Sequence, residues 1–382
     1  EIVREMRLAL FAPQVIEESR AAAKKVARGE EFGPLEPKYP SILTPSVVET
    51  PSGTFGYLRI WKFNFNPSLF ISEFMRLITT LPQDGLIIDV RGNGGGVIWN
   101  SEYILQMLTP RWIEPEPTQF INTPLNLEIC RKNGPDSEWT DLSPWVESMQ
   151  QALPTGSIFS AGFPISDPAI SNIFGQKYFG PVVLITDALC YSATDIFAAG
   201  FQDHDIGPIL GADGNTGAGG ANVWEHQYFV YDILPNSVYR ALPDGAGMRV
   251  SIRRTLRVGT RAGAPVEDLG VVPNHRHFMT RADVLHKNVD LINAAAALLE
   301  PLPKRSLKVT LNPTSATQLA VTVTTVRIDR LDLYVDGRPI ESVDIQGEQT
   351  TFDVVKRTSE VAALELRGFE GGELVARYRQ DI

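Results

Sequence analysis

Ser192 lies between an apolar run and a segment with a helical pattern. Residues 181–186 (PVVLIT) are typical of a strand buried on both faces, and residues 193–201 (ATDIFAAGF) predict a helix. A serine at a helix start is close to free backbone N–H groups and to the positive end of the helix dipole. Such groups stabilise a developing oxyanion, so Ser192 is a candidate nucleophile with the Ala193 N–H as a donor. The alternative is a simple helix N-cap.

A second candidate feature is a glycine run that also follows an apolar stretch. Residues 84–90 (DGLIIDV) predict another buried strand, and residues 91–96 (RGNGGG) follow it directly. Glycines let the backbone approach a ligand closely and expose its N–H groups. A tight turn or a phosphate loop is the alternative, although neither common phosphate-loop pattern is completed.

Four blocks in a fixed order resemble the C-terminal processing (tail-specific) serine peptidases. Residues 89–96 resemble D-[LV]-R-x-N-x-G-G, and residues 191–197 resemble the nucleophile segment S-A-x-E-[IL]-F, with Asp195 at the usual glutamate. Residues 209–220 and 263–274 resemble the two later blocks, so the resemblance covers roughly residues 50–300. It implies that Ser192 is the nucleophile. It also implies an oxyanion hole formed by the N–H of Ala193 and that of Gly95 or Gly96.

The general base departs from the usual pattern of that family. Its common lysine belongs to a T-x-G-K-G block, but residues 216–220 read TGAGG. The chain is therefore more similar to the branch of the tricorn core and the chlamydial protease, where a histidine upstream of the serine is the base and a glutamate supports it. Glu267 matches that glutamate, and the alternative for Glu267 is a solvated loop acid.

All five histidines follow Ser192 in the sequence. They are His204, His226, His275, His277 and His286. Twelve residues of helix separate His204 from Ser192 by roughly 18 Å, which excludes it as the base. His226 and His286 are interpreted as structural or solvated, whereas spacing does not exclude His275 and His277. We therefore expect a segment preceding Glu1 to supply a histidine base, and the chain alone to be weakly active or inactive.

Cys190, two residues before Ser192, offers a thiol as an alternative nucleophile. Its other interpretation is a small buried residue. Cys190 and Cys130 are the two cysteines of the chain, which is too few for a disulfide framework, and no metal-ligand spacing accompanies them. We expect no metal and no cofactor.

The elements predict an α/β fold, with a mixed sheet and flanking helices like the ClpP/crotonase-like peptidase core. Six short strands after residue 305 predict a C-terminal all-β immunoglobulin-like sandwich. We expect an N-terminal helix and linker over residues 1–50, a peptidase core over 51–303 and the sandwich over 304–382. The core contains an insertion at 110–179, predicted to pack over it or cover a cleft.

Further patterns predict individual elements. Helices are expected at 6–27, 67–81, 101–108 and 282–299, and strands at 55–63, 223–234 and 248–258.

Composition narrows the class of partner. The 382 residues carry a net charge of −10, which argues against nucleic acid or an anionic membrane as the main partner, and no apolar run is long enough to span a bilayer. We predict a serine endopeptidase acting on unfolded or C-terminal segments of polypeptides, in a periplasmic or secreted location. The alternatives are a pseudo-peptidase that binds peptides, and an interaction protein that binds through its C-terminal β region.

Overall fold

A six-stranded mixed sheet forms the centre of the molecule. The computed structural model describes residues 6, 10, 12–137, 140–220, 223–235, 237–315, 318–355 and 362–382. The strand order is β1-β2-β3-β6-β7-β11; β1 and β2 are antiparallel and every other neighbouring pair is parallel. The strands are β1 (Leu43–Thr50), β2 (Gly53–Ile60), β3 (Leu86–Asp89), β6 (Val182–Thr186), β7 (Ile209–Gly211) and β11 (His275–Arg276).

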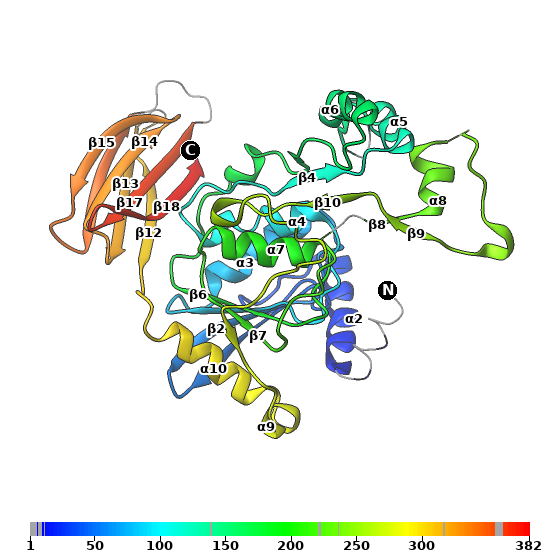
Figure 1. Ribbon diagram of the computed structural model, residues 1–382. Helices are drawn as coiled ribbons and strands as arrows, with labels where there is room; N and C mark the ends of the chain where they lie inside the picture. Colours follow the sequence, from blue (N-terminus) through cyan, green and yellow to red (C-terminus); the bar gives the residue numbers. More distant parts are fainter. Residues whose placement is uncertain are drawn as a thin grey trace.

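Helices cover both faces of this sheet (Figure 1). On one face lie α3 (Pro67–Thr80), α4 (Ile98–Glu102) and α7 (Ala193–Asp203), and on the other lies α10 (Val289–Leu299). Ile88 and Leu184 lie in the apolar core that includes side chains of α3 and α7, whereas Ile87 and Val183 lie in the apolar core that includes side chains of α10. Because successive side chains of a strand point to opposite faces, β3 and β6 need apolar residues on both faces, and both are apolar except at their last residues, Asp89 and Thr186. The predicted α/β class with a mixed sheet is confirmed.

A second group of elements lies above the sheet and is called here the upper lobe, residues 117–164 and 223–255 (Figure 1). Its elements are β4 (Pro117–Phe120), α5 (Pro124–Lys132), α6 (Val146–Ala152), β5 (Phe163–Pro164), β8 (Val223–Glu225), α8 (His226–Tyr228), β9 (Arg249–Ser251) and β10 (Arg253–Thr255). Phe120, Trp145 and Met149 pack with Trp224 and Phe229 in one apolar core. The insertion expected at 110–179 therefore shares its core with a segment that follows Ser192.

Three predicted elements differ from the structure. Of the strand expected at 223–234 only Val223–Glu225 forms, as β8, because the chain turns helical after Glu225 and continues as a π-helical turn, Phe229–Ile233. The strand expected at 248–258 divides into β9 and β10, which pair in different sheets. The long helix expected at 282–299 divides into α9 (Arg281–Leu285) and α10, because Lys287 and Asn288 between them adopt φ of 54° and 62°.

The N-terminal helix expected over residues 6–27 is α2 (Pro13–Arg28), and the first part of that prediction lies largely outside the described residues. The helix expected at 101–108 is the short α4 followed by a 3₁₀ turn, Gln106–Leu108. No helix within the described ranges is long and apolar enough to cross a membrane.

The C-terminal region is the expected all-β sandwich. One sheet contains β12 (Ser306–Pro313), β13 (Gln318–Val326) and β16 (Gln349–Val355); the other contains β15 (Arg338–Asp344), β14 (Arg330–Val335), β17 (Ala363–Glu370) and β18 (Glu373–Asp381). Asp336 and Gly337, with φ of 51° and 72°, form the tight turn between β14 and β15. The strand β15 was not predicted, because nearly all of its residues are exposed and it lacks an apolar alternation.

Candidate active site

Ser192 occupies a strained turn at the start of α7. Its backbone angles are φ 56° and ψ −122°, and the Thr194 N–H donates to the Tyr191 carbonyl at 3.0 Å. This is the geometry of a type II′ turn with Ser192 in the position that glycine normally fills. Its hydroxyl caps no helix N–H, so the simple N-cap interpretation is wrong. A serine held at strained angles between a strand and a helix is the arrangement of a nucleophile elbow.

Gly95 lies directly against Ser192. A Cβ added to Gly95 would stand 2.7 Å from the Ser192 Cβ and 2.9 Å from the Ala193 nitrogen. At Gly96 an added Cβ would lie 2.0 Å from the Asn64 nitrogen. Both residues also have positive φ, 93° and 146°. A side chain at Gly95 would therefore displace the backbone beside Ser192, and one at Gly96 would displace the backbone of Phe63 and Asn64.

The candidate oxyanion donors are not equivalent. The Gly95 N–H donates to the Asn93 side-chain oxygen at 2.9 Å, so it already has a partner. Within the described residues no hydrogen-bond acceptor is found for the N–H of Ala193 or of Gly96. Gly95 thus supplies close approach, and the N–H groups of Ala193 and Gly96 remain the candidate oxyanion donors.

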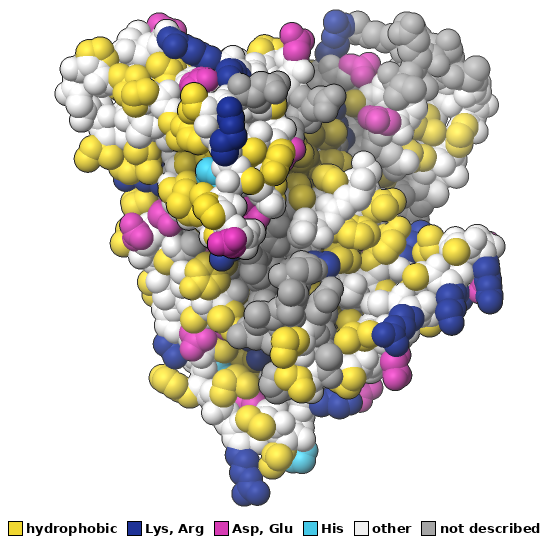
Figure 2. All heavy atoms as spheres, turned by 90° about the vertical axis from the view of Figure 1, so that its right-hand side faces the viewer, with side chains coloured by type: hydrophobic (Ala, Val, Ile, Leu, Met, Phe, Trp, Pro, Cys, Tyr) yellow, Lys and Arg dark blue, Asp and Glu magenta, His cyan; other side chains and the backbone are white. Residues whose placement is uncertain are grey.

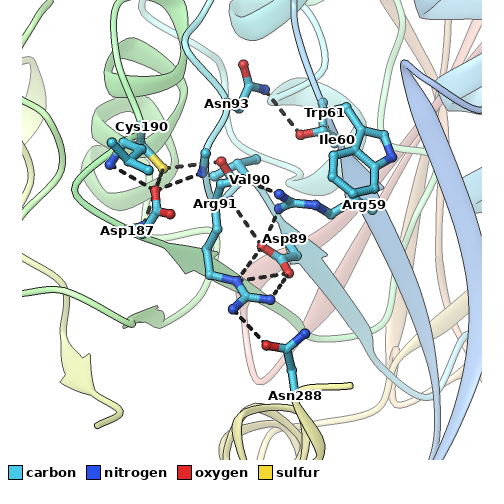
Figure 3. Close-up of polar contacts among 12 residues, drawn as sticks. Arg59, Ile60, Trp61, Asp89, Val90, Arg91, Asn93, Asp187, Cys190 and Asn288 are labelled. Atoms are coloured by element: carbon cyan, nitrogen blue, oxygen red, sulfur yellow. Dashed lines mark hydrogen bonds and ion pairs between the residues drawn. The ribbon is translucent and has the colours of Figure 1, made fainter. Parts of the chain in front are cut away.

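A buried ionic network supports the glycine turn (Figure 3). Asp89 is fully buried and accepts hydrogen bonds from Arg59 at 2.6 Å, Arg91 at 2.8 Å and the Tyr57 hydroxyl at 2.7 Å. Burial alone would raise the pKa of Asp89, but the two guanidinium groups hold it well below its usual range. Arg91 also donates to the Asn288 side chain at 3.1 Å, which links the turn to the start of α10.

Asp187 ties the glycine turn to the segment that carries Ser192. Its carboxylate accepts the N–H groups of Gly92 at 2.8 Å and of Leu189 at 3.0 Å. Cys190 is buried beside it and donates its thiol to the Val90 carbonyl at 3.2 Å. Burial raises the pKa of this thiol well above its usual value, so it stays protonated and is a poor nucleophile. The geometry favours the buried structural interpretation of Cys190.

Asp195 holds the loop 216–220 against the start of α7. Its carboxylate accepts the N–H groups of Ala218 at 3.2 Å and Gly219 at 3.0 Å, and the Ser192 N–H donates to the Gly219 carbonyl at 3.1 Å. Burial raises the pKa of Asp195 to about 6, although these hydrogen bonds partly oppose it. The Tyr191 ring covers the loop, and a Cβ added at Gly219 would lie 2.4 Å from it. The ring thus occupies the space that a lysine in this block would need.

Glu267 lies beside the same loop. Its neighbour Asp268 donates its N–H to the Ala218 carbonyl at 3.1 Å, and one carboxylate oxygen of Glu267 is buried. Glu267 is therefore not a freely solvated acid, and its catalytic role stays a prediction.

The histidines have contacts elsewhere. His204 is buried at the end of α7, where its Nε2 accepts the Glu114 N–H at 3.0 Å and its Nδ1 contacts the Gly200 carbonyl at 2.8 Å. His277 contacts Asp283 at 2.7 Å after β11, and His226 contacts the Arg240 carbonyl in the upper lobe. His275 and His286 are exposed. None of the hydrogen bonds of these five described residues involves Ser192.

A pocket of about 360 Å³ begins at the glycine turn and extends under the upper lobe. We call it the Trp99 pocket. One wall is Gly96, Val97, Ile98 and Trp99, and the other is Asn133, Thr140, Leu142, Ile165, Trp224, Ile233 and Arg253. On the face that carries strands β8 and β9, hydrophobic side chains gather around a hollow (Figure 2). The sequence did not single out Asp187, Arg59 or Arg253, because their importance depends on contacts between distant segments.

Comparison with known proteins gives the family. The model of peptidase family S41 matches residues 54–276, more than half of the chain. No curated protein sequence matches. Similar solved structures include mature CPAF complexed with lactacystin (19% identity, 68% of this chain and 55% of that chain, TM-score 0.47) and the photosystem II D1 C-terminal processing protease (16%, 71% and 53%, 0.38). The tricorn protease is a further one (18%, 64% and 17%, 0.32).

The chain spans about half the length of the first of these structures. The matched residues include both turns that meet at Ser192 and the loop 216–220. The chain belongs to peptidase family S41.

Proposed function

We propose that this protein is a serine peptidase that cleaves polypeptides through an acyl-enzyme on Ser192. The observation that carries the proposal is the strained Ser192 turn with the Gly95 backbone packed against it. A fold maintains such strain when the geometry serves a function. Here the Ser192 hydroxyl does not cap α7, and it lies next to the Ala193 N–H, which has no backbone acceptor within the described residues.

The proposed reaction has two steps. The Ser192 Oγ attacks the peptide carbonyl carbon while its proton moves to a general base, and the Ala193 and Gly96 N–H groups donate to the carbonyl oxygen as it becomes an oxyanion. The intermediate collapses, the C–N bond breaks, and the base returns the proton to the leaving amine. Water then attacks the ester and releases the second product.

The base is open to experiment. A serine hydroxyl needs a proton acceptor within hydrogen-bond reach. Lys62 directly precedes Phe63, whose N–H donates to the Gly95 carbonyl at 3.1 Å, so Lys62 is a candidate that sequence reasoning did not consider. A histidine supplied from elsewhere remains the candidate implied by the sequence resemblance. Assays of the chain, of Lys62→Met and His277→Gln variants, and of a chain carrying any native residues that precede Glu1 separate these sources.

The substrate class proposed is an unfolded or C-terminal polypeptide segment, because an extended chain can place one side chain in the Trp99 pocket while its backbone passes Ser192. A periplasmic or secreted location stays a prediction, which cell fractionation would measure.

Labelling with a fluorophosphonate tests the nucleophile. We expect labelling at Ser192 that is lost in Ser192→Ala. It should fall by about 10²-fold or more in Gly95→Ala, where the new Cβ would meet Ser192 and Ala193. Gly94→Ala is the matched control, since an added Cβ there meets nothing within 4 Å.

Equal labelling of the Gly95→Ala and Gly94→Ala variants would contradict the proposed role of the turn. A folded wild-type chain, with any native residues preceding Glu1 included, that neither reacts with the probe nor cleaves casein but still binds peptides would support the pseudo-peptidase alternative.

A further inference from the structure

Arg253 is an unusual residue in the Trp99 pocket. It lies on β10, only 7% exposed, with its guanidinium 5.6 Å from the centre of the Phe120 ring. In the part of the chain that the structure describes, no carboxylate forms an ion pair with it and no side-chain hydrogen bond satisfies it. Other buried arginines have acidic partners: Arg257 bonds Asp203 at 2.8 Å, and Arg377 bonds Glu365 at 3.1 Å.

An isolated buried charge is energetically costly. Removing a guanidinium from water without a compensating anion disfavours the folded state. Burial lowers the pKa of Arg253 to about 10, so the group is still protonated near neutral pH. An anion that enters the pocket would therefore gain a charge-assisted hydrogen bond and relieve this cost.

The pocket is also placed to receive substrate. Its near wall begins at Gly96, the residue that follows Gly95, and Gly95 packs against Ser192. A group bound in this pocket thus belongs to a residue close to the scissile bond. The remaining lining is largely apolar, from Val97, Ile98 and Trp99 on one side to Trp224 and Ile233 on the other. Such a lining suits the methylene groups of a side chain that ends in an anion.

We propose that the Trp99 pocket is a specificity subsite in which Arg253 binds a carboxylate of the polypeptide substrate next to the scissile bond. The inference rests on the proposed peptidase function for the position of the substrate. The carboxylate has two possible sources, an aspartate or glutamate side chain and the free C-terminus of the polypeptide.

The test is a set of matched peptides assayed with the full chain. The first kind of pair places Glu or Gln at one position near the cleaved bond, and each position is tested in turn. The second kind of pair has either a C-terminal acid or a C-terminal amide. We expect one pair to show a preference for the carboxylate of about tenfold or more in kcat/KM, because a site built for an ion rejects its neutral analogue. Which pair responds identifies the source.

The variants assign the preference to one side chain. Arg253→Met should reduce the ratio to about one, and Arg253→Lys should retain part of it, since lysine keeps the charge but loses the planar fork. Arg254→Met is the matched control, because Arg254 bonds Gln119 at 2.8 Å and covers the Phe159 ring rather than lining the pocket. An unchanged ratio in Arg253→Met, with thermal unfolding like that of the control, would overturn the proposal.

Failure of the subsite and failure of the peptidase function give different results. Ser192-dependent cleavage with no carboxylate preference in either pair would reject the subsite and leave the peptidase function. If no cleavage occurs, binding of the same fluorescent peptides to Ser192→Ala decides the subsite alone. Binding that is about tenfold tighter for the acid and lost in Arg253→Met supports it, and equal binding of acid and neutral peptides overturns it.

Discussion

The backbone of Ser192 provides a test that is independent of activity. A non-glycine residue held at φ 56° and ψ −122° carries strain of about 1–3 kcal/mol. Ser192→Gly should relieve it, and after the greater entropy loss of glycine on folding we expect a gain of about 1 kcal/mol in the free energy of unfolding. Ser192→Ala keeps the strain and should not gain. Denaturant unfolding of both variants is the measurement, and equal stability would mean that the turn is not strained.

The residues of the candidate site could be predicted from the sequence where they belong to a local motif. Ser192 follows an apolar run and Gly95 follows another, so both could be proposed from the sequence. The involvement of the Gly95 N–H with Asn93 could not, because it depends on how one turn folds on itself. Arg253 is on a three-residue strand about sixty positions away from Ser192, and its isolation is a property of the packed lobe.

The buried side chain of Glu102 connects α4 to the segment below the upper lobe. Glu102 accepts the Glu116 N–H at 3.0 Å and bonds the Ser166 hydroxyl, and burial raises the pKa of Glu102 to about 7. A folded-state pKa above the unfolded one means that the folded protein binds this proton more tightly. The contribution of Glu102 to stability should therefore fall as pH rises from about 4.5 to about 7 and stay constant above that range.

Glu102→Gln should remove this pH dependence while it keeps both hydrogen bonds. We expect the variant to match the wild type near pH 4.5. At pH 8 we expect it to exceed the wild type by on the order of 2–3 kcal/mol in the free energy of unfolding. Thermal or denaturant unfolding at several pH values measures the difference. If the stability curves of the variant and the wild type stay parallel across the pH range, burial does not raise the pKa of Glu102.

Buried elements were easier to predict than exposed ones. The strands β3 and β6 are apolar except at their last residues, Asp89 and Thr186, because both faces of the sheet are covered, and the sequence placed them within about two residues. The break between α9 and α10 contains neither glycine nor proline, so no local signal marked it. The π-helical turn after β8 is held by lobe packing around Phe229 and Ile233, which a strand-like sequence pattern does not reveal.

At the scale of the whole molecule, the sandwich contacts the core through the segment 175–179. The Gln176 N–H donates to the Arg377 carbonyl at 2.8 Å, Lys177 donates to the Arg379 carbonyl at 2.9 Å, and Phe179 packs against the sandwich core. Gly175 is closely approached, since an added Cβ would lie 2.7 Å from the Arg379 Cβ. The sequence predicted the sandwich from its strands but not this contact, which joins residues about two hundred positions apart.

The expected domain limit near residue 303 can be tested through this contact. A chain ending at Pro303 should keep a cooperative unfolding transition and Ser192 labelling, because the sheet and the α7 turn have their own apolar cores. Its stability should be lower by on the order of 1–3 kcal/mol, since Phe179 loses its burial. The newly exposed Phe179 ring should also lower the solubility of the shortened chain. Phe179→Ser should restore part of that solubility, whereas a core substitution such as Leu184→Ser should not. Loss of the cooperative transition on shortening would mean that the sandwich and the core fold as one unit.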